Sequence, residues 1–128
     1  MNKLSNIFKI IFHFLNIMLI FFYLFPGSIS GWFLYKDLTK QPQLTNDFMN
    51  ISSNHFYTFF VLSFFGILSY LRHKKFNLLI KYLLLLSVVL ELFHLLIPQR
   101  SFQFGDLFGN ILGVFLVLLI NQIWRLRT

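Results

Sequence analysis

Four long apolar segments, separated by one long and two short polar stretches, constrain what this chain can fold into. They cover about residues 7–25, 55–71, 76–97 and 107–124. Each is close to the roughly 20 residues that a helix needs to cross about 30 Å of hydrocarbon. Open sheets are not expected, because lipid cannot satisfy the exposed edge of a sheet. The sequence therefore predicts an all-α bundle of four transmembrane helices.

The composition indicates lipid rather than water as the main solvent of this chain. Of its 128 residues, 57% are hydrophobic and 12% are charged, whereas an ordinary soluble domain has about 25% charged residues. Four acidic side chains are too few for the surface of a soluble protein. The length allows one domain, so we expect residues 1–128 to form a single membrane domain.

The basic residues predict the orientation. Eight of the eleven flank the apolar segments on one side, namely Lys3, Lys9, Arg72, Lys74, Lys75, Lys81, Arg125 and Arg127. The positive-inside rule then places both termini in the cytoplasm of a multi-pass protein of the cell membrane. The net charge of +7 does not indicate a nucleic-acid partner, because these residues form no stripe on a polar surface. The connection 27–54 is expected outside, where a short interfacial helix over Ser30–Leu38 fits.

Strongly polar side chains near the outer ends of the segments are the candidate functional residues, because such groups are costly at bilayer depth. Glu91 and His94 are three residues apart and share one face of the third segment. Asp106, Asn110 and Gly113 fall on one stripe of the fourth segment. The connection between these two segments is short, so we expect antiparallel neighbours whose polar faces meet.

The predicted ligand-binding or functional cluster comprises His55, Glu91, His94, Arg100, Asp106 and Asn110. Gly113 and Pro98 are assigned to helix packing, since a small residue lets backbones approach closely. In the alternative interpretation the cluster is structural only. Arg100 would then pair with Glu91 or Asp106 and neutralise buried charge.

Four of these residues have side chains that suit a divalent metal ion: Glu91, His94, His55 and Asp106. Metal sites inside helical bundles typically use two Glu-x-x-His motifs, and this chain has one. We therefore predict no metal and no other cofactor from the sequence. Disulfides and thiolate sites are excluded, because the chain has no cysteine.

The stretch from Glu91 to Gly113 reads ELFHLLIPQRSFQFGDLFGNILG. Together with His55-Phe56, it resembles the VanZ-like family, whose signature is roughly E-x-x-Q, a Pro and an Arg, then D-x-x-x-N-x-x-G, with D-K-x-x-H-F on the second helix. This chain departs from the signature where His94 replaces the Gln, where Ile51-Ser52 replaces Asp-Lys, and where Val117 replaces a later Gly.

The resemblance implies a protein of the bacterial inner membrane and cell envelope, associated with resistance to the glycopeptide teicoplanin. Its expected partners are the bilayer and a lipid-linked cell-wall precursor or glycopeptide. On this hypothesis Arg100 contacts an anionic group such as phosphate, and Glu91 and Asp106 orient the arginine. A membrane enzyme acting on a lipid-linked precursor is the alternative, with His55 or His94 as base and Glu91 as acid. A transporter is less favoured, because the chain is short for an inverted repeat.

Overall fold

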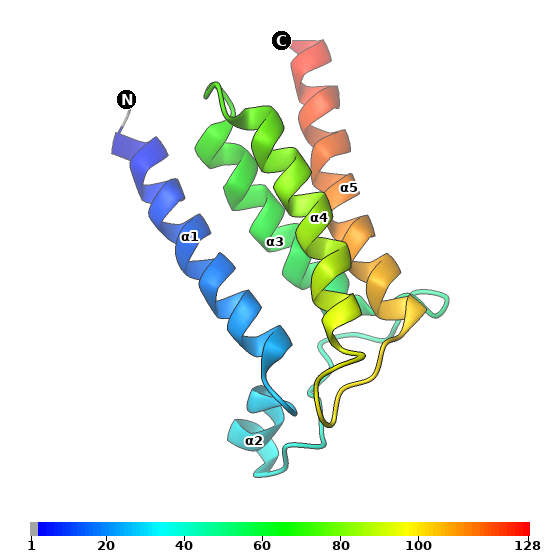
Figure 1. The fold of residues 1–128 in the computed structure, drawn as a ribbon. Coiled ribbons are helices and arrows are strands. Elements are labelled where there is room, and N and C mark those ends of the chain that lie inside the picture. Colours follow the sequence, from blue (N-terminus) through cyan, green and yellow to red (C-terminus); the bar gives the residue numbers. More distant parts are fainter. Residues whose placement is uncertain (1–2) are drawn as a thin grey trace.

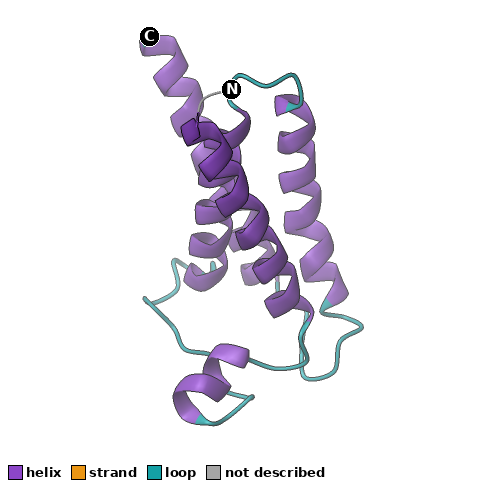
Figure 2. Ribbon diagram, turned by 90° about the vertical axis from the view of Figure 1, so that its left-hand side faces the viewer, coloured by secondary structure: helices purple, strands orange, loops and turns teal. Residues whose placement is uncertain are grey.

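The computed structural model describes residues 3–128 and is all-helical, as predicted (Figures 1 and 2). Its five helices are α1 (Lys3–Leu24), α2 (Ile29–Tyr35), α3 (Ser53–Tyr70), α4 (Phe76–Phe93) and α5 (Phe104–Arg127). Within this described range the only β pairing is an isolated bridge between Phe48 and Ile51. The four long helices pack side by side, and α3 contacts each of the other three.

Three helices in the described range, α1, α4 and α5, are long and apolar enough to cross a membrane. Their outward faces carry large exposed apolar side chains, among them Ile10 at 71%, Leu85 at 64% and Phe115 at 59% exposure. α3 corresponds to the second predicted segment and is not among these three helices, because serines and a histidine interrupt its apolar sequence. One face of it is packed against its neighbours, where Phe59 is fully buried, while Val61 and Phe64 on the other face are exposed.

The chain runs up and down through the bundle. The described N-terminal end, the α3–α4 turn and the C-terminus lie at one end in Figure 1, and α2 lies at the other end with the two long connections. Each connection between consecutive long helices therefore reverses the chain direction. This arrangement brings the start of α3, the end of α4 and the start of α5 together at the α2 end.

Two helix boundaries near that end differ from the sequence prediction for physical reasons. α4 ends at Phe93 rather than near residue 97, because its last turn tightens into bonds between residues three apart, such as Leu96 N–H to Phe93 O at 2.9 Å. Pro98 then prevents regular helix before it, and Gln99 turns the chain with a positive φ of 61°. α2 ends at Tyr35, earlier than the expected Leu38, because Lys36 adopts a left-handed conformation.

Three glycines of α5 form its contact with α3 and the segment before it. A Cβ atom at Gly109 would lie 2.6 Å from the carbonyl oxygen of Ser52, and one at Gly113 would lie 2.6 Å from that of Phe56. A Cβ atom at Gly105 would lie even closer to the carbonyl oxygen of Asn50. The stripe therefore lets α5 approach α3 at backbone distance, as small residues do between membrane helices.

Substitution Gly113→Leu is expected to push α5 away from α3 and to lower stability by about 1–3 kcal/mol, the usual cost of overpacking. Thermal unfolding of the purified protein in detergent should show a midpoint at least about 5 °C lower. Gln122→Leu, which changes an exposed side chain of the same helix, is the control and should leave the midpoint unchanged. Equal midpoints for the two variants would contradict the close contact.

Candidate functional site

A buried polar network lies at the α2 end of the bundle, where four helices meet. We use the name "polar network" for Tyr23, His55, Glu91, His94, Asp106 and Asn110. Glu91 and Asn110 are fully buried and His94 is 2% exposed, whereas Asp106 is partly buried. Ser52 positions His55 by capping the start of α3, where its hydroxyl accepts the His55 N–H at 3.5 Å.

Asn110 is the hub of the polar network. Its amide nitrogen donates to the carbonyl oxygen of Ser87 at 3.0 Å, which fixes the orientation of the side chain. Its Oδ1 therefore accepts, and the Tyr23 hydroxyl donates to it at 2.8 Å. Nδ1 of His55 lies 3.0 Å from the same oxygen. The Tyr23 hydroxyl also lies 2.9 Å from this Nδ1. Because an amide oxygen can only accept, the contact between His55 and Asn110 is a hydrogen bond in the tautomer that carries the proton on Nδ1.

The second ring nitrogen of His55 faces a carboxylate. Its Nε2 lies 3.6 Å from Oδ2 of Asp106. When Nδ1 of a neutral imidazole carries the proton, Nε2 is a lone pair. In that tautomer two acceptors face each other, and either a proton or a metal ion between them removes their repulsion.

Glu91 is held on one side only. Its Oε1 accepts the backbone N–H of Gln103 at 3.1 Å, but its buried Oε2 has no hydrogen-bond partner among the described residues. Nδ1 of His94 is 3.2 Å from Oε2 without hydrogen-bond alignment. The other His94 nitrogen, Nε2, donates to the Tyr23 carbonyl oxygen at 3.0 Å. An unsatisfied buried carboxylate is costly, so a positively charged group next to Oε2 would stabilise this site.

Arg100 does not pair with Glu91 or Asp106, so the predicted ion pair and the predicted orientation of Arg100 by these carboxylates are wrong. Its guanidinium instead donates to the carbonyl oxygens of Phe22 at 2.8 Å and Phe25 at 3.1 Å. These carbonyls end α1, where helix oxygens lack intrahelical partners and the helix dipole is negative. Partial burial lowers the pKa of Arg100, but a guanidinium remains charged at neutral pH.

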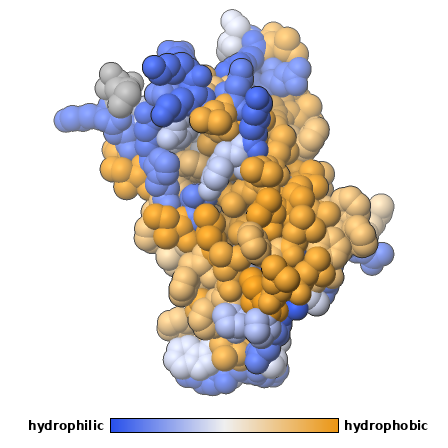
Figure 3. All heavy atoms as spheres, viewed as in Figure 1, coloured by the Kyte–Doolittle hydropathy of each residue, from blue (hydrophilic) through white to orange (hydrophobic). Residues whose placement is uncertain are grey.

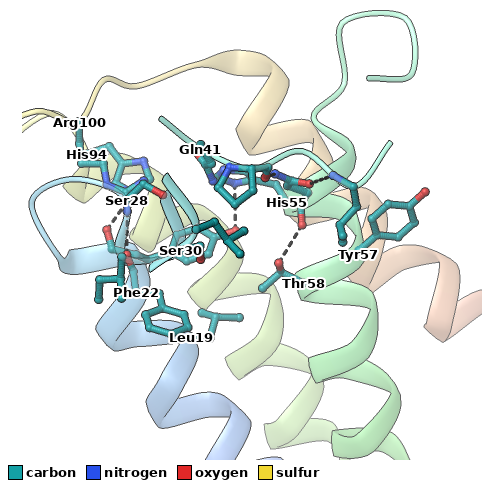
Figure 4. Close-up of a pocket in the computed structure, with 16 residues that line it drawn as sticks. Leu19, Phe22, Ser28, Ser30, Gln41, His55, Tyr57, Thr58, His94 and Arg100 are labelled. Carbon is teal, nitrogen blue, oxygen red and sulfur yellow. Dashed lines mark hydrogen bonds between the residues drawn. The ribbon is translucent and has the colours of Figure 1, made fainter. Parts of the chain in front are cut away.

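A cavity of about 340 Å³ lies between α1, α2, the connection from α2 to α3, and α3. Arg100 and His94 lie on one side of it in Figure 4, and His55 lies on the other. Leu19 and Phe22 supply part of its mainly apolar lining. The cavity therefore combines a cationic group with a hydrocarbon-like wall.

A second, smaller cavity of about 170 Å³ also reaches His55. Its lining is polar and consists of Gln41, Gln43, Asp47, Ser52, Asn54, His55, Gln103 and Asp106. His55 thus borders both cavities, which we call the apolar cavity and the polar cavity. Asp106 lines only the polar one.

Five of the six predicted cluster residues come together in the polar network, and Arg100 shares the apolar cavity with two of them. Pro98 lies in the turn after α4, and Gly113 lies at the contact with α3. Sequence reasoning missed Tyr23, whose ring stacks on His94 with centroids 5.6 Å apart. A tyrosine hydroxyl within an apolar segment usually needs a buried partner, and that signal could have identified it.

The chain matches no family model, no curated protein and no solved structure.

Asn110→Ala should destabilise the protein more than loss of a single hydrogen bond does, because it leaves Tyr23, His55 and the Ser87 carbonyl without a shared partner. Each buried group left unsatisfied costs about 1–3 kcal/mol. Asn16→Ala is the matched control, since half-buried Asn16 accepts one bond, from Tyr82 at 2.7 Å. Thermal midpoints in detergent should fall clearly further for Asn110→Ala. A larger fall for Asn16→Ala would refute the role of Asn110 as hub.

Proposed function

We propose that this chain is an integral membrane protein of the VanZ-like type that crosses the membrane four times. Both ends lie in the cytoplasm in this proposal, and the polar network faces outward. The apolar band between hydrophilic ends in Figure 3 supports the membrane setting. Support for the orientation comes from Arg72, Lys74 and Lys75, which lie in the turn at the same end of the bundle as the termini.

Cysteine accessibility tests this topology directly, because the chain has no native cysteine. Met49→Cys changes a side chain that is 91% exposed in the connection before α3, and Lys74→Cys changes an exposed one in the α3–α4 turn. A membrane-impermeant maleimide on intact cells should label the first variant and not the second. After permeabilisation both should react. Labelling of Lys74→Cys on intact cells would overturn the proposed orientation.

The proposed activity is binding of an anionic, lipid-linked ligand such as a cell-wall precursor, as an accessory function in the cell envelope. One observation carries it: the apolar cavity contains a guanidinium that is paired with no carboxylate among residues 3–128. Arg100 has five N–H donors, and its two bonds to α1 leave others for a ligand. Arginine suits phosphate because its planar donors bind two oxygens at once.

The remainder of the cavity suits the hydrocarbon of such a ligand. Leu19 and Phe22 from α1 and Leu34 from α2 line it. Leu34 is 66% exposed, so the apolar lining extends to the surface of the protein. A phosphate at Arg100 would therefore have an apolar path for its chain towards the bilayer.

Binding of undecaprenyl phosphate to the purified protein in detergent tests the proposed activity. Arg100→Gln should weaken binding by about tenfold or more, equivalent to about 1.4 kcal/mol, whereas Arg100→Lys should retain part of the affinity. Arg125→Gln is the matched control, since Arg125 also donates to a carbonyl oxygen, that of Leu71 at 3.2 Å, at the other end of the bundle.

Undecaprenol, which lacks the phosphate, should bind more weakly than the phosphate form. Thermal unfolding of each variant establishes that it is folded before binding is compared. Unchanged affinity in folded Arg100→Gln, or equal binding of undecaprenol, would contradict the proposal.

A membrane enzyme acting on a lipid-linked precursor is the second candidate. It is favoured by His55, whose ring borders the apolar cavity while its Nε2 faces Asp106. Conversion of the bound precursor to a product by the purified protein would favour this candidate over simple binding.

A further inference from the structure

We propose that His55, Glu91 and Asp106 bind a divalent first-row metal ion of the zinc type beside the polar cavity. This inference does not depend on the lipid-linked ligand proposed above, because it concerns the polar cavity, which Arg100 does not line. The described residues that could supply donor atoms to one ion at this place are these three, with one atom of each within 4.8 Å of the others.

The distances suit a small ion. Protein nitrogen and oxygen ligands lie about 2.0–2.2 Å from zinc, so two ligands of a tetrahedral site are about 3.4 Å apart. His55 Nε2 and Asp106 Oδ2 are separated by 3.6 Å. An ion between these two atoms would require only a small movement of either side chain.

The hydrogen bonding of His55 matches that of a metal ligand. A metal-bound histidine typically donates its other ring N–H to an oxygen, which fixes the tautomer and the direction of the free nitrogen. Here the Asn110 amide oxygen is the acceptor for Nδ1. The hydrogen bond from the Asn110 amide nitrogen to the Ser87 carbonyl oxygen fixes the orientation of that amide. In this tautomer the lone pair is on Nε2, 3.6 Å from Oδ2 of Asp106.

Glu91 supplies the independent observation. Its side chain is fully buried, and its Oε2 has no hydrogen-bond partner within the described chain. Oε2 lies 3.9 Å from Nδ1 of His55, and a carboxylate oxygen of Glu91 lies within 4.8 Å of ligand atoms of both His55 and Asp106. A metal ion would give this oxygen a positive partner in addition to Nδ1 of His94, which lies 3.2 Å away without hydrogen-bond alignment.

Charge balance favours a divalent ion. Glu91 and Asp106 bring two negative charges into a largely buried place, and no lysine or arginine pairs with either one in the described range. Buried charges are strongly unfavourable unless they are neutralised. One divalent cation neutralises both carboxylates and leaves the histidines neutral. Imidazole together with carboxylate oxygens is a donor set that suits zinc.

The polar cavity provides access for the ion. Its lining includes His55 and Asp106 together with amide side chains such as Gln41 and Gln103, which can replace water around an entering ion. Three protein ligands leave one position of a tetrahedral ion open towards this cavity. An open position is the arrangement of catalytic rather than structural zinc sites. His94, whose Nδ1 is 3.2 Å from Glu91 Oε2, is then a positioning residue for that carboxylate.

Zinc titration of the full chain, purified without a polyhistidine tag and stripped with a chelator, tests the site. Isothermal titration calorimetry should show one Zn²⁺ per chain, and zinc should raise the thermal midpoint because it binds the folded state. Co²⁺ in its place should give the visible absorption of a four-coordinate ion.

Variants identify the ligands. Loss of an outer partner of a metal ligand typically weakens binding about 10–100-fold, so Asp106→Asn and His55→Gln should each weaken it at least about 100-fold. Asp47→Asn is the matched control, since Asp47 lines the same cavity outside the proposed ligand set. Asp106 is partly exposed, so Asp106→Asn should fold and allow zinc affinity to be measured even if His55→Gln does not fold.

Absence of stoichiometric zinc binding by the wild-type protein would overturn the proposal. Unchanged zinc affinity in folded Asp106→Asn would do so as well, and would assign the network to shared protons only. Neither result depends on whether undecaprenyl phosphate binds at Arg100.

Discussion

The contact between α5 and α3 determines the geometry of everything at the α2 end of the bundle. Gly109 and Gly113 allow the two backbones to touch, with a Cβ at either position only 2.6 Å from a carbonyl oxygen of the partner segment. Asp106 and Asn110 lie on the same part of α5, and they reach His55 because of this approach. Larger residues at the glycine positions would separate the helices and thereby open the polar network.

The polar network is organised around acceptors rather than around ion pairs. One oxygen of Asn110 contacts both the Tyr23 hydroxyl and Nδ1 of His55. One oxygen of Glu91 has no hydrogen-bond donor among the described residues. Arg100 does not neutralise Glu91, because its guanidinium donates to carbonyl oxygens at the end of α1. Positive charge and negative charge are therefore held in neighbouring but separate places. This separation is unusual for a purely structural cluster, in which buried charges are normally paired.

Much of the fold follows from the sequence, because apolar segments of helical length and a short turn between two of them leave few arrangements. The facing stripes of Glu91 and Asn110 also follow from helical periodicity. The partner of Arg100 does not, since the end of α1 is remote in sequence and only tertiary packing brings its carbonyls near. The same holds for Tyr23. The end of α4 does not follow from the sequence either, because the apolar side chains continue to Ile97. The regular helix ends at Phe93, where the hydrogen bonds change to residues three apart.

His55 lines both the apolar cavity and the polar cavity, and this shared position has a thermodynamic consequence. A ligand in the apolar cavity and an ion beside the polar cavity would both lie next to the imidazole ring of His55. Any displacement or change of charge of that ring would then alter both affinities. Such linkage is reciprocal, so each ligand would change the affinity for the other by the same factor. The His55 side chain would thus couple binding of the lipid-linked ligand to binding of the metal ion.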